Sequence, residues 1–211
     1  MNARIYSYLF TLILLAACAQ ETKDKVVGII VLNDFEQAYI DDIITNIESY
    51  YKCKCVLLNT IQLPQNCITT IKYTRYRADS IIRYLRVIKP DSIDYILGLT
   101  NENISNTQYD ENGKIKFPES YFVDFSILGL GFRPGKSCVV SSFNFWNADS
   151  NLAKTRLKKI AIHELRHNFG LPHCKSKDCV IQDGTETLKI LDESDTKLCR
   201  KCSKKINRMI R

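Results

Sequence analysis

Every histidine of the 211-residue chain lies in one stretch, HELRHNFGLPH, at residues 163–173. His163 and His167 are four residues apart, so on a helix they share one face, about one turn from each other. Two imidazoles held at this spacing can bind one zinc ion. The spacing therefore predicts a helix here, with this face turned toward a metal.

The residues around the two histidines predict the rest of a catalytic zinc site. Glu164 could reach a water on the metal without being a ligand, which is the geometry of a general base. Gly170 ends the helix at a structural turn, because glycine accepts the left-handed conformation, and Pro172 cannot continue the helix. This bend can bring His173 back as the third ligand and leave a fourth position open for water. Ordinary polar residues of a surface helix are the alternative, but they would not explain why every histidine lies here.

Four cysteines continue the pattern, which reads HELRHNFGLPHC-x4-C-x-I-x17-C-x2-C and includes Cys174, Cys179, Cys199 and Cys202. It resembles the archaemetzincins, whose motif is HExxHxxGxxHCx4CxMx17CxxC. The resemblance implies an α/β, metzincin-like fold with a mixed sheet over an active-site helix and a small C-terminal four-cysteine subdomain. It also implies two zinc ions per chain, one catalytic and one structural. Four thiolates would close the structural site as a tetrahedron.

One position departs from the family motif. The archaemetzincins have methionine where this chain has Ile181. In metzincins that methionine is an apolar floor beneath the zinc and not a ligand. Isoleucine has a similar volume but a stiffer, branched side chain. The change is expected to affect the fine geometry and the rate, and not metal binding.

The cysteines allow a second interpretation. The N-terminal residues predict export, and an exported protein meets oxidising conditions. The four cysteines Cys174, Cys179, Cys199 and Cys202 could therefore form two disulfides instead. The spacing favours zinc. Four further cysteines, at positions 53, 55, 67 and 138, could pair or remain buried thiols, and sequence does not give their connectivity.

The N-terminal residues predict export and a lipid anchor. Arg4 is followed by an apolar run that is too short to span a membrane and has the length of a secretory signal. Leu15-Ala16-Ala17-Cys18 resembles a bacterial lipobox, which implies cleavage before Cys18 and lipid on its thiol. We therefore expect a signal peptide at 1–17, a tether at 18–25, and one metallopeptidase domain at 26–211. The mature protein would be lipid-anchored outside the cytoplasm of a bacterium. An ordinary signal peptide is the alternative.

Strand and helix patterns alternate along the remaining chain. Such alternation predicts a largely parallel sheet, and a possible hairpin near residues 133–135 makes it mixed. Residues 101–120 are expected to form a loop. The expected strands are 26–32, 54–58, 94–100, 121–128 and 138–143, and the expected helices are 35–51, 78–88 and 151–169.

The formal net charge of +7 comes partly from basic residues at 154–159 and 197–211. We interpret both groups as solvated helix faces, and we expect a monomer that binds no nucleic acid. The expected partner is a peptide or protein substrate, hydrolysed by a zinc-dependent metallopeptidase. The alternative function is a catalytically weak or inactive zinc-binding lipoprotein that binds a partner. Glu164 favours the enzyme, because a pure binder has no use for a base at that position.

Overall fold

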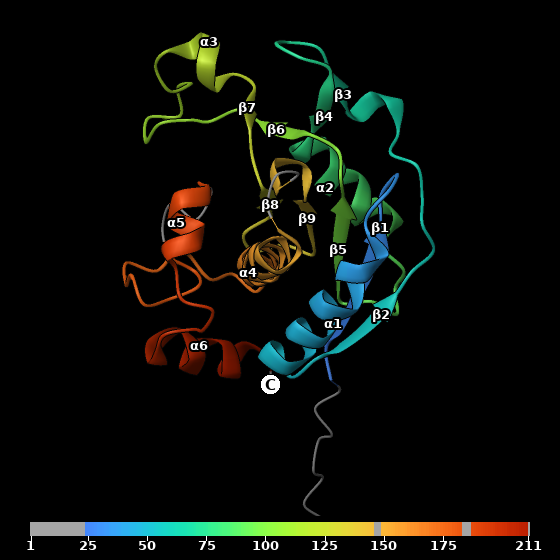
Figure 1. Cartoon of the computed structure of the whole chain (residues 1–211), viewed down its shortest axis with the longest axis vertical. Coiled ribbons are helices and arrows are strands. Elements are labelled where there is room, and N and C mark those ends of the chain that lie inside the picture. The colour runs from blue at the N-terminus through green and yellow to red at the C-terminus, as the bar shows by residue number, and fades with distance from the viewer. Residues whose placement is uncertain (1–23, 146–148, 183–186, 211) are drawn as a thin grey trace, which may run out of the picture.

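The computed structural model describes residues 24–145, 149–182 and 187–210. Its centre is a five-stranded mixed sheet in the order β2-β1-β5-β9-β8 (Figure 1). Four strands run parallel and β8 is the antiparallel edge strand. The bounds are β1 (Val26–Val31), β2 (Lys54–Leu57), β5 (Tyr95–Thr100), β8 (Gly129–Gly131) and β9 (Ser137–Ser141). The predicted mixed sheet is confirmed.

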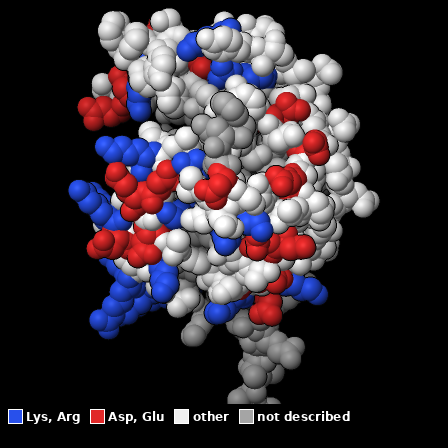
Figure 2. All heavy atoms as spheres, viewed as in Figure 1, with Lys and Arg blue, Asp and Glu red and all other residues white. Residues whose placement is uncertain are grey.

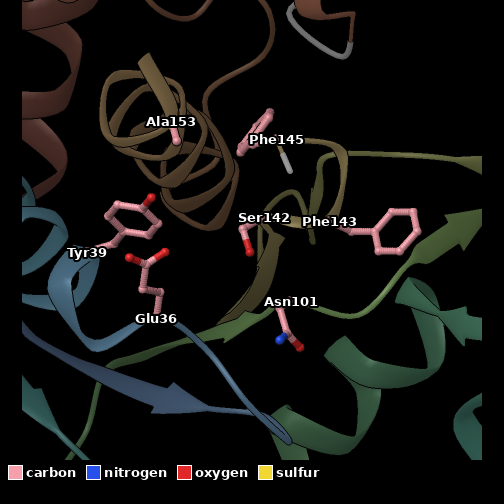
Figure 3. Close-up of a pocket in the computed structure, with 7 residues that line it drawn as sticks. All are labelled: Glu36, Tyr39, Asn101, Ser142, Phe143, Phe145 and Ala153. Carbon is pink, nitrogen blue, oxygen red and sulfur yellow. The ribbon is translucent and has the colours of Figure 1, made fainter. Parts of the chain in front are cut away.

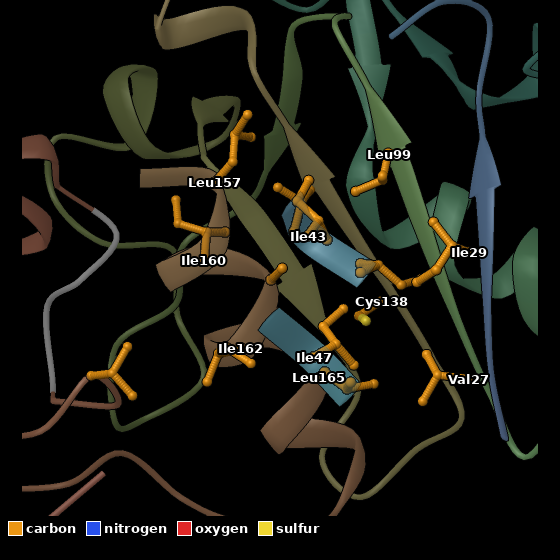
Figure 4. Packing of buried hydrophobic residues seen from close by; sticks show 14 of the residues in the cluster. Val27, Ile29, Ile43, Ile47, Leu99, Cys138, Leu157, Ile160, Ile162 and Leu165 are labelled. Atoms are coloured by element: carbon orange, nitrogen blue, oxygen red, sulfur yellow. The ribbon is translucent and has the colours of Figure 1, made fainter. Parts of the chain in front are cut away.

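Helices cover both faces of this sheet and bury two separate cores. Alternate residues of a strand point to opposite faces, so Ile29 packs toward α1 (Gln37–Tyr51) and α4 (Ser150–Asn168), whereas Ile30 packs toward α2 (Ala78–Ile88). Figure 4 shows the first core, in which Ile29, Leu99 and Cys138 from the strands face side chains of α1 and α4. Burial on both faces explains the continuous apolar runs of the central strands.

A second, smaller sheet has the order β3-β4-β6-β7. It consists of β3 (Ile68–Thr69), β4 (Arg75–Arg77), β6 (Ile104–Asn106) and β7 (Phe125–Ser126), with η1 (Gln65–Cys67) before it and α3 (Glu119–Phe122) before β7. The expected loop at 101–120 and the expected strand at 121–128 were therefore wrong in detail. Strands of two or three residues are too short to produce a periodic pattern in the sequence.

The C-terminal part contains α5 (Leu188–Glu193) and α6 (Arg200–Ile210), and η2 (Phe143–Phe145) precedes α4. Two basic residues of α4 attach α5. The Lys159 ammonium donates to the carbonyls of Leu191 and Ser194 at 2.8 and 2.6 Å, and Arg156 forms two hydrogen bonds with Asp192. Lys159 and Arg156 are only 6% and 8% exposed. The interpretation of 154–159 as a solvated face was wrong for these two residues, because α5 packs over them.

Helix α6 does present basic side chains to solvent. Its exposed residues include Arg200, Lys201, Lys204, Lys205 and Arg208. Figure 2 shows Lys and Arg side chains gathered at the lower left, where α6 lies, with acidic side chains above them. This face agrees with the solvated surface that the charge pattern predicted.

The predicted signal peptide and Cys18 lie outside the described residues, as does most of the tether, so cleavage and lipidation stay predictions. Among the helices of the described ranges, none has both the length and the apolar character needed to cross a bilayer.

Candidate metal centres

Helix α4 carries the first two histidines on its C-terminal half. The helix begins after Asp149, whose carboxylate accepts the backbone N–H groups of Asn151 and Leu152. His163 and His167 are 3% and 8% exposed, and their ring centroids are 5.2 Å apart. The two imidazoles therefore lie side by side in the interior, as their spacing on one helix requires.

The end of α4 turns the chain back toward these rings. Gly170 has a φ of 87°, in the left-handed region, and its N–H donates to the His167 carbonyl at 2.8 Å. Three residues later, His173 Nε2 lies 3.2 Å from His163 Nε2. One ligand atom from each histidine lies within 4.8 Å of the others. The turn thus brings together three imidazoles from two segments.

Backbone carbonyls orient two of the rings. His167 Nδ1 contacts the Leu171 carbonyl at 3.2 Å, which turns Nε2 toward the centre of the cluster. Burial, aided by Arg166, holds the pKa of His163 well below its usual range, and a hydrogen bond to the Val180 backbone opposes this shift. Burial also lowers the pKa of His167 to about 3. Both rings are therefore neutral at pH 7, which is the form that binds a metal.

Glu164 is buried beside the edge strand β8. A Cβ atom at Gly129 would lie 2.7 Å from Glu164 Cγ, and one at Gly131 would lie 2.6 Å from the Glu164 carbonyl oxygen. Only glycine leaves room for α4 to approach β8 this closely. The sheet edge and the predicted base therefore belong to one wall of the site.

The four cysteine sulfurs form a second cluster, also within 4.8 Å of one another. Cys174 Sγ and Cys199 Sγ are 3.8 Å apart, far longer than a disulfide bond. Burial raises the pKa of the Cys199 thiol, but hydrogen bonds from the Cys202 backbone and from neighbouring thiols outweigh it and bring the pKa to about 7. All eight cysteines in the described part of the chain are free thiols. The two-disulfide alternative is therefore not what this structure shows.

Both clusters have the dimensions of a tetrahedral zinc site. Nitrogen ligands about 2.0–2.1 Å from zinc are about 3.3 Å from each other, and sulfur ligands at about 2.3 Å are about 3.8 Å apart. The distances of 3.2 Å between His163 and His173 and 3.8 Å between Cys174 and Cys199 agree with these values. The donor sets fit zinc in both places.

A short turn connects the two clusters. Its Cys179 belongs to the cysteine cluster, and Val180 is hydrogen-bonded to His163. The carbonyl of Ile181, which is fully buried, accepts the Cys174 N–H at 2.8 Å. The position at which the sequence departs from the archaemetzincin motif therefore lies in the turn that links the two predicted metal sites.

Two of the hollows in the described part of the chain are the larger ones near α4. One, of about 610 Å³, lies beside His173 and the cysteine cluster and includes Lys175, Lys201 and Lys205 in its lining. The other, of about 570 Å³, has Glu36 and Tyr39 on one side and Phe143 and Phe145 on the other (Figure 3). This second hollow is lined by Ala153, ten residues before His163 and thus about 15 Å away along the helix. Of these two hollows, the first has His173 in its lining and the second is lined by none of the three histidines.

Sequence reasoning missed Arg166. It lies within the histidine motif as one of the unspecified positions, but its side chain is fully buried and its guanidinium contacts two of the imidazoles. Burial lowers its pKa to about 10, so it remains a cation at neutral pH. The signal in the sequence was a charged residue on the helix face next to the predicted ligands.

A model of the family described as peptidase family M54 matches residues 20–208 of the chain. The chain is 29% identical over 150 residues to the archaemetzincin of Methanopyrus kandleri, covering 71% of this chain and 75% of that protein. It is 32% identical over 132 residues to the archaemetzincin of Archaeoglobus fulgidus, and the match covers 63% of this chain and 69% of that protein.

Solved structures share the fold. The crystal structure of the Methanopyrus kandleri archaemetzincin has a TM-score of 0.71 at 21% identity, covering 91% of this chain and 98% of that one. The structure of the Archaeoglobus fulgidus archaemetzincin complexed with malonate has a TM-score of 0.66 at 22% identity. The match covers 85% of this chain and 99% of that one.

Proposed function

The chain belongs to peptidase family M54, and from this premise we propose that it hydrolyses peptide bonds with zinc held by His163, His167 and His173. Family membership supports a zinc metallopeptidase. The observation that carries the assignment to this site is the convergence of three imidazoles from α4 and the turn after it. The four cysteines would hold a second, structural zinc.

In this proposal, zinc supplies Lewis acidity, which polarises the scissile carbonyl and lowers the pKa of a water to about 7. Glu164 accepts the proton of the attacking water and later passes it to the leaving amine. The neutral histidines would supply three nitrogen ligands to the metal. Glu164 is buried with its Cγ against β8, and this packing would restrict the orientations of its carboxylate.

We further propose that a substrate peptide pairs with β8. Leu128 and Phe132 make their backbone hydrogen bonds to β9, through Ser141 and Ser137. Because these bonds alternate along an antiparallel strand, Gly129 and Gly131 point their backbone groups away from β9. An extended peptide could add to this edge beside Glu164.

Peptides that are N-methylated at one amide at a time would test this pairing. Strand addition predicts that kcat/KM falls at least about tenfold for methylation at every second amide near the cleaved bond and much less at the amides between. Equal sensitivity at neighbouring amides would contradict pairing with β8. The unmethylated peptide is the matched control.

A zinc count tests the proposed function directly, on the chain from residue 19 beside its His167→Ala variant. We expect two zinc ions per chain, one for each cluster, and one in the variant. The variant should lose peptide cleavage together with the zinc ion of the histidine cluster. One zinc that survives the substitution would mean that only the cysteine cluster fills, and a non-enzymatic binding protein would then be favoured. Absence of zinc in both proteins would contradict both sites.

A further inference from the structure

The hollow of about 610 Å³ beside His173 is lined by charges of one sign. Four of its lining residues are cations, and none of those in the described part of the chain is acidic; the cations are Lys175, Arg200, Lys201 and Lys205. The volume lies within the range of about 300–1,000 Å³ that is typical of ligand pockets. The hollow is therefore large enough for a substrate side chain and has the charge to select an anionic one.

These cations are available to a ligand. All of them are exposed, and within residues 24–145, 149–182 and 187–210 none of them forms an ion pair. Lys201 and Lys205 are four residues apart on α6, so they share one face of that helix. Lys175 comes from the segment that follows His173. The positive charge around the hollow thus comes from two separate segments of the chain.

The cysteine cluster is the other group that these cations could serve, because Cys174, Cys199 and Cys202 also line the hollow. Four thiolates around one zinc ion would carry a net charge of about −2. The four lining cations together carry +4, so about two positive charges would remain unbalanced. This excess favours an anionic ligand over a role in charge balance alone.

The hollow also adjoins the proposed catalytic site. His173 belongs to its lining, and His173 Nε2 lies 3.2 Å from His163 Nε2. An extended peptide advances about 3.3–3.4 Å per residue, so a residue one or two positions from the cleaved bond could place its side chain here. A single exposed ion pair contributes little, but several cations around one hollow attract an anion together.

We propose that this hollow selects peptides that carry an aspartate or glutamate one or two residues from the cleaved bond. The side-chain carboxylate binds to Lys201 and Lys205 of α6, together with Lys175 and Arg200. These residues determine specificity and touch no reacting atom. The inference rests on the proposed function, because it places the cleaved bond at the histidine cluster.

Peptide binding to the full chain tests the proposal, with Glu164→Gln present to prevent cleavage during the measurement. Fluorescent peptides with amidated C-termini carry glutamate or glutamine at one position at a time, and their Kd values are compared. The test variant combines Lys201→Gln and Lys205→Gln. The matched control combines Lys204→Gln and Arg208→Gln, which removes two exposed cations of the same helix that do not line the hollow. Both variants therefore have the same net charge.

We expect the glutamate peptide to bind at least about tenfold more tightly than its glutamine counterpart at one or two positions. The preference should fall below about threefold in the test variant and persist in the control. Equal Kd values at every position would overturn the proposal. Equal loss of the preference in both variants would also overturn it and assign the effect to overall charge. If the test variant fails to fold, Lys175→Gln beside Lys177→Gln gives the same comparison.

Cleavage by the unaltered protein separates this inference from the proposed function. The ratio of kcat/KM for the glutamate and glutamine peptides should show the same preference as binding. Cleavage without a preference for acidic residues would overturn the inference and leave the peptidase assignment in place. Tighter binding of acidic peptides without cleavage of any peptide would support the selective hollow and contradict the proposed peptidase.

Discussion

Replacement of Glu164 by glutamine is expected to lower kcat for peptide cleavage by about 10²–10⁴-fold. Glutamine has nearly the same shape but cannot accept the proton of the attacking water. Because Glu164 is not among the ligand atoms of either cluster, both zinc ions should remain. The measurements are kcat with a peptide substrate and zinc per chain on the same preparation.

The matched control is Glu193→Gln, an exposed glutamate on α5 that belongs to neither cluster. It should cleave at the normal rate. A Glu164→Gln protein that keeps full activity would exclude the general-base role. Loss of zinc together with activity would mean that the glutamate supports the metal site itself, and the rate would then say nothing about proton transfer.

Replacement of Cys179 by serine is expected to remove one zinc ion and to destabilise the C-terminal part of the fold. Its sulfur is fully buried and accepts the Cys199 N–H at 3.3 Å. Structural zinc sites contribute on the order of 10 kcal/mol of binding free energy, and most of this is folding free energy. We expect the midpoint of thermal unfolding to fall to the value that the unaltered protein shows after its zinc has been chelated.

The same substitution should also weaken the histidine site. Cys179 begins the turn in which Val180 is hydrogen-bonded to His163. In the same turn, the Ile181 carbonyl accepts the N–H of Cys174, the residue after His173. Zinc affinity of the histidines, measured by chelator competition, should fall at least about tenfold. Cys67→Ser is the matched control, since Cys67 is equally buried but lies outside the cluster. Unchanged affinity in Cys179→Ser would show that the two sites are independent.

Much of the fold and of the candidate site could be predicted from the sequence, because the information is local. The expected helix at 78–88 agrees with α2, and the one at 151–169 agrees with α4 to within a residue at each end. Their apolar spacing and capping residues lie within the segment that forms the helix. The spacing of the histidines and cysteines is local in the same way, and it indicated both clusters before any contact between them was known.

The contacts between distant segments were decided by the tertiary structure alone. Lys159 and Arg166 are ordinary helix residues in the sequence. Lys159 is buried because α5 packs over it, and Arg166 is buried against the histidine rings and the Leu171 carbonyl. The edge position of β8 depends on which strands pair across long loops. Local periodicity and ligand spacing determined where the metal sites form. Which charged groups face those sites depends on packing between residues far apart in the chain, which no local pattern records.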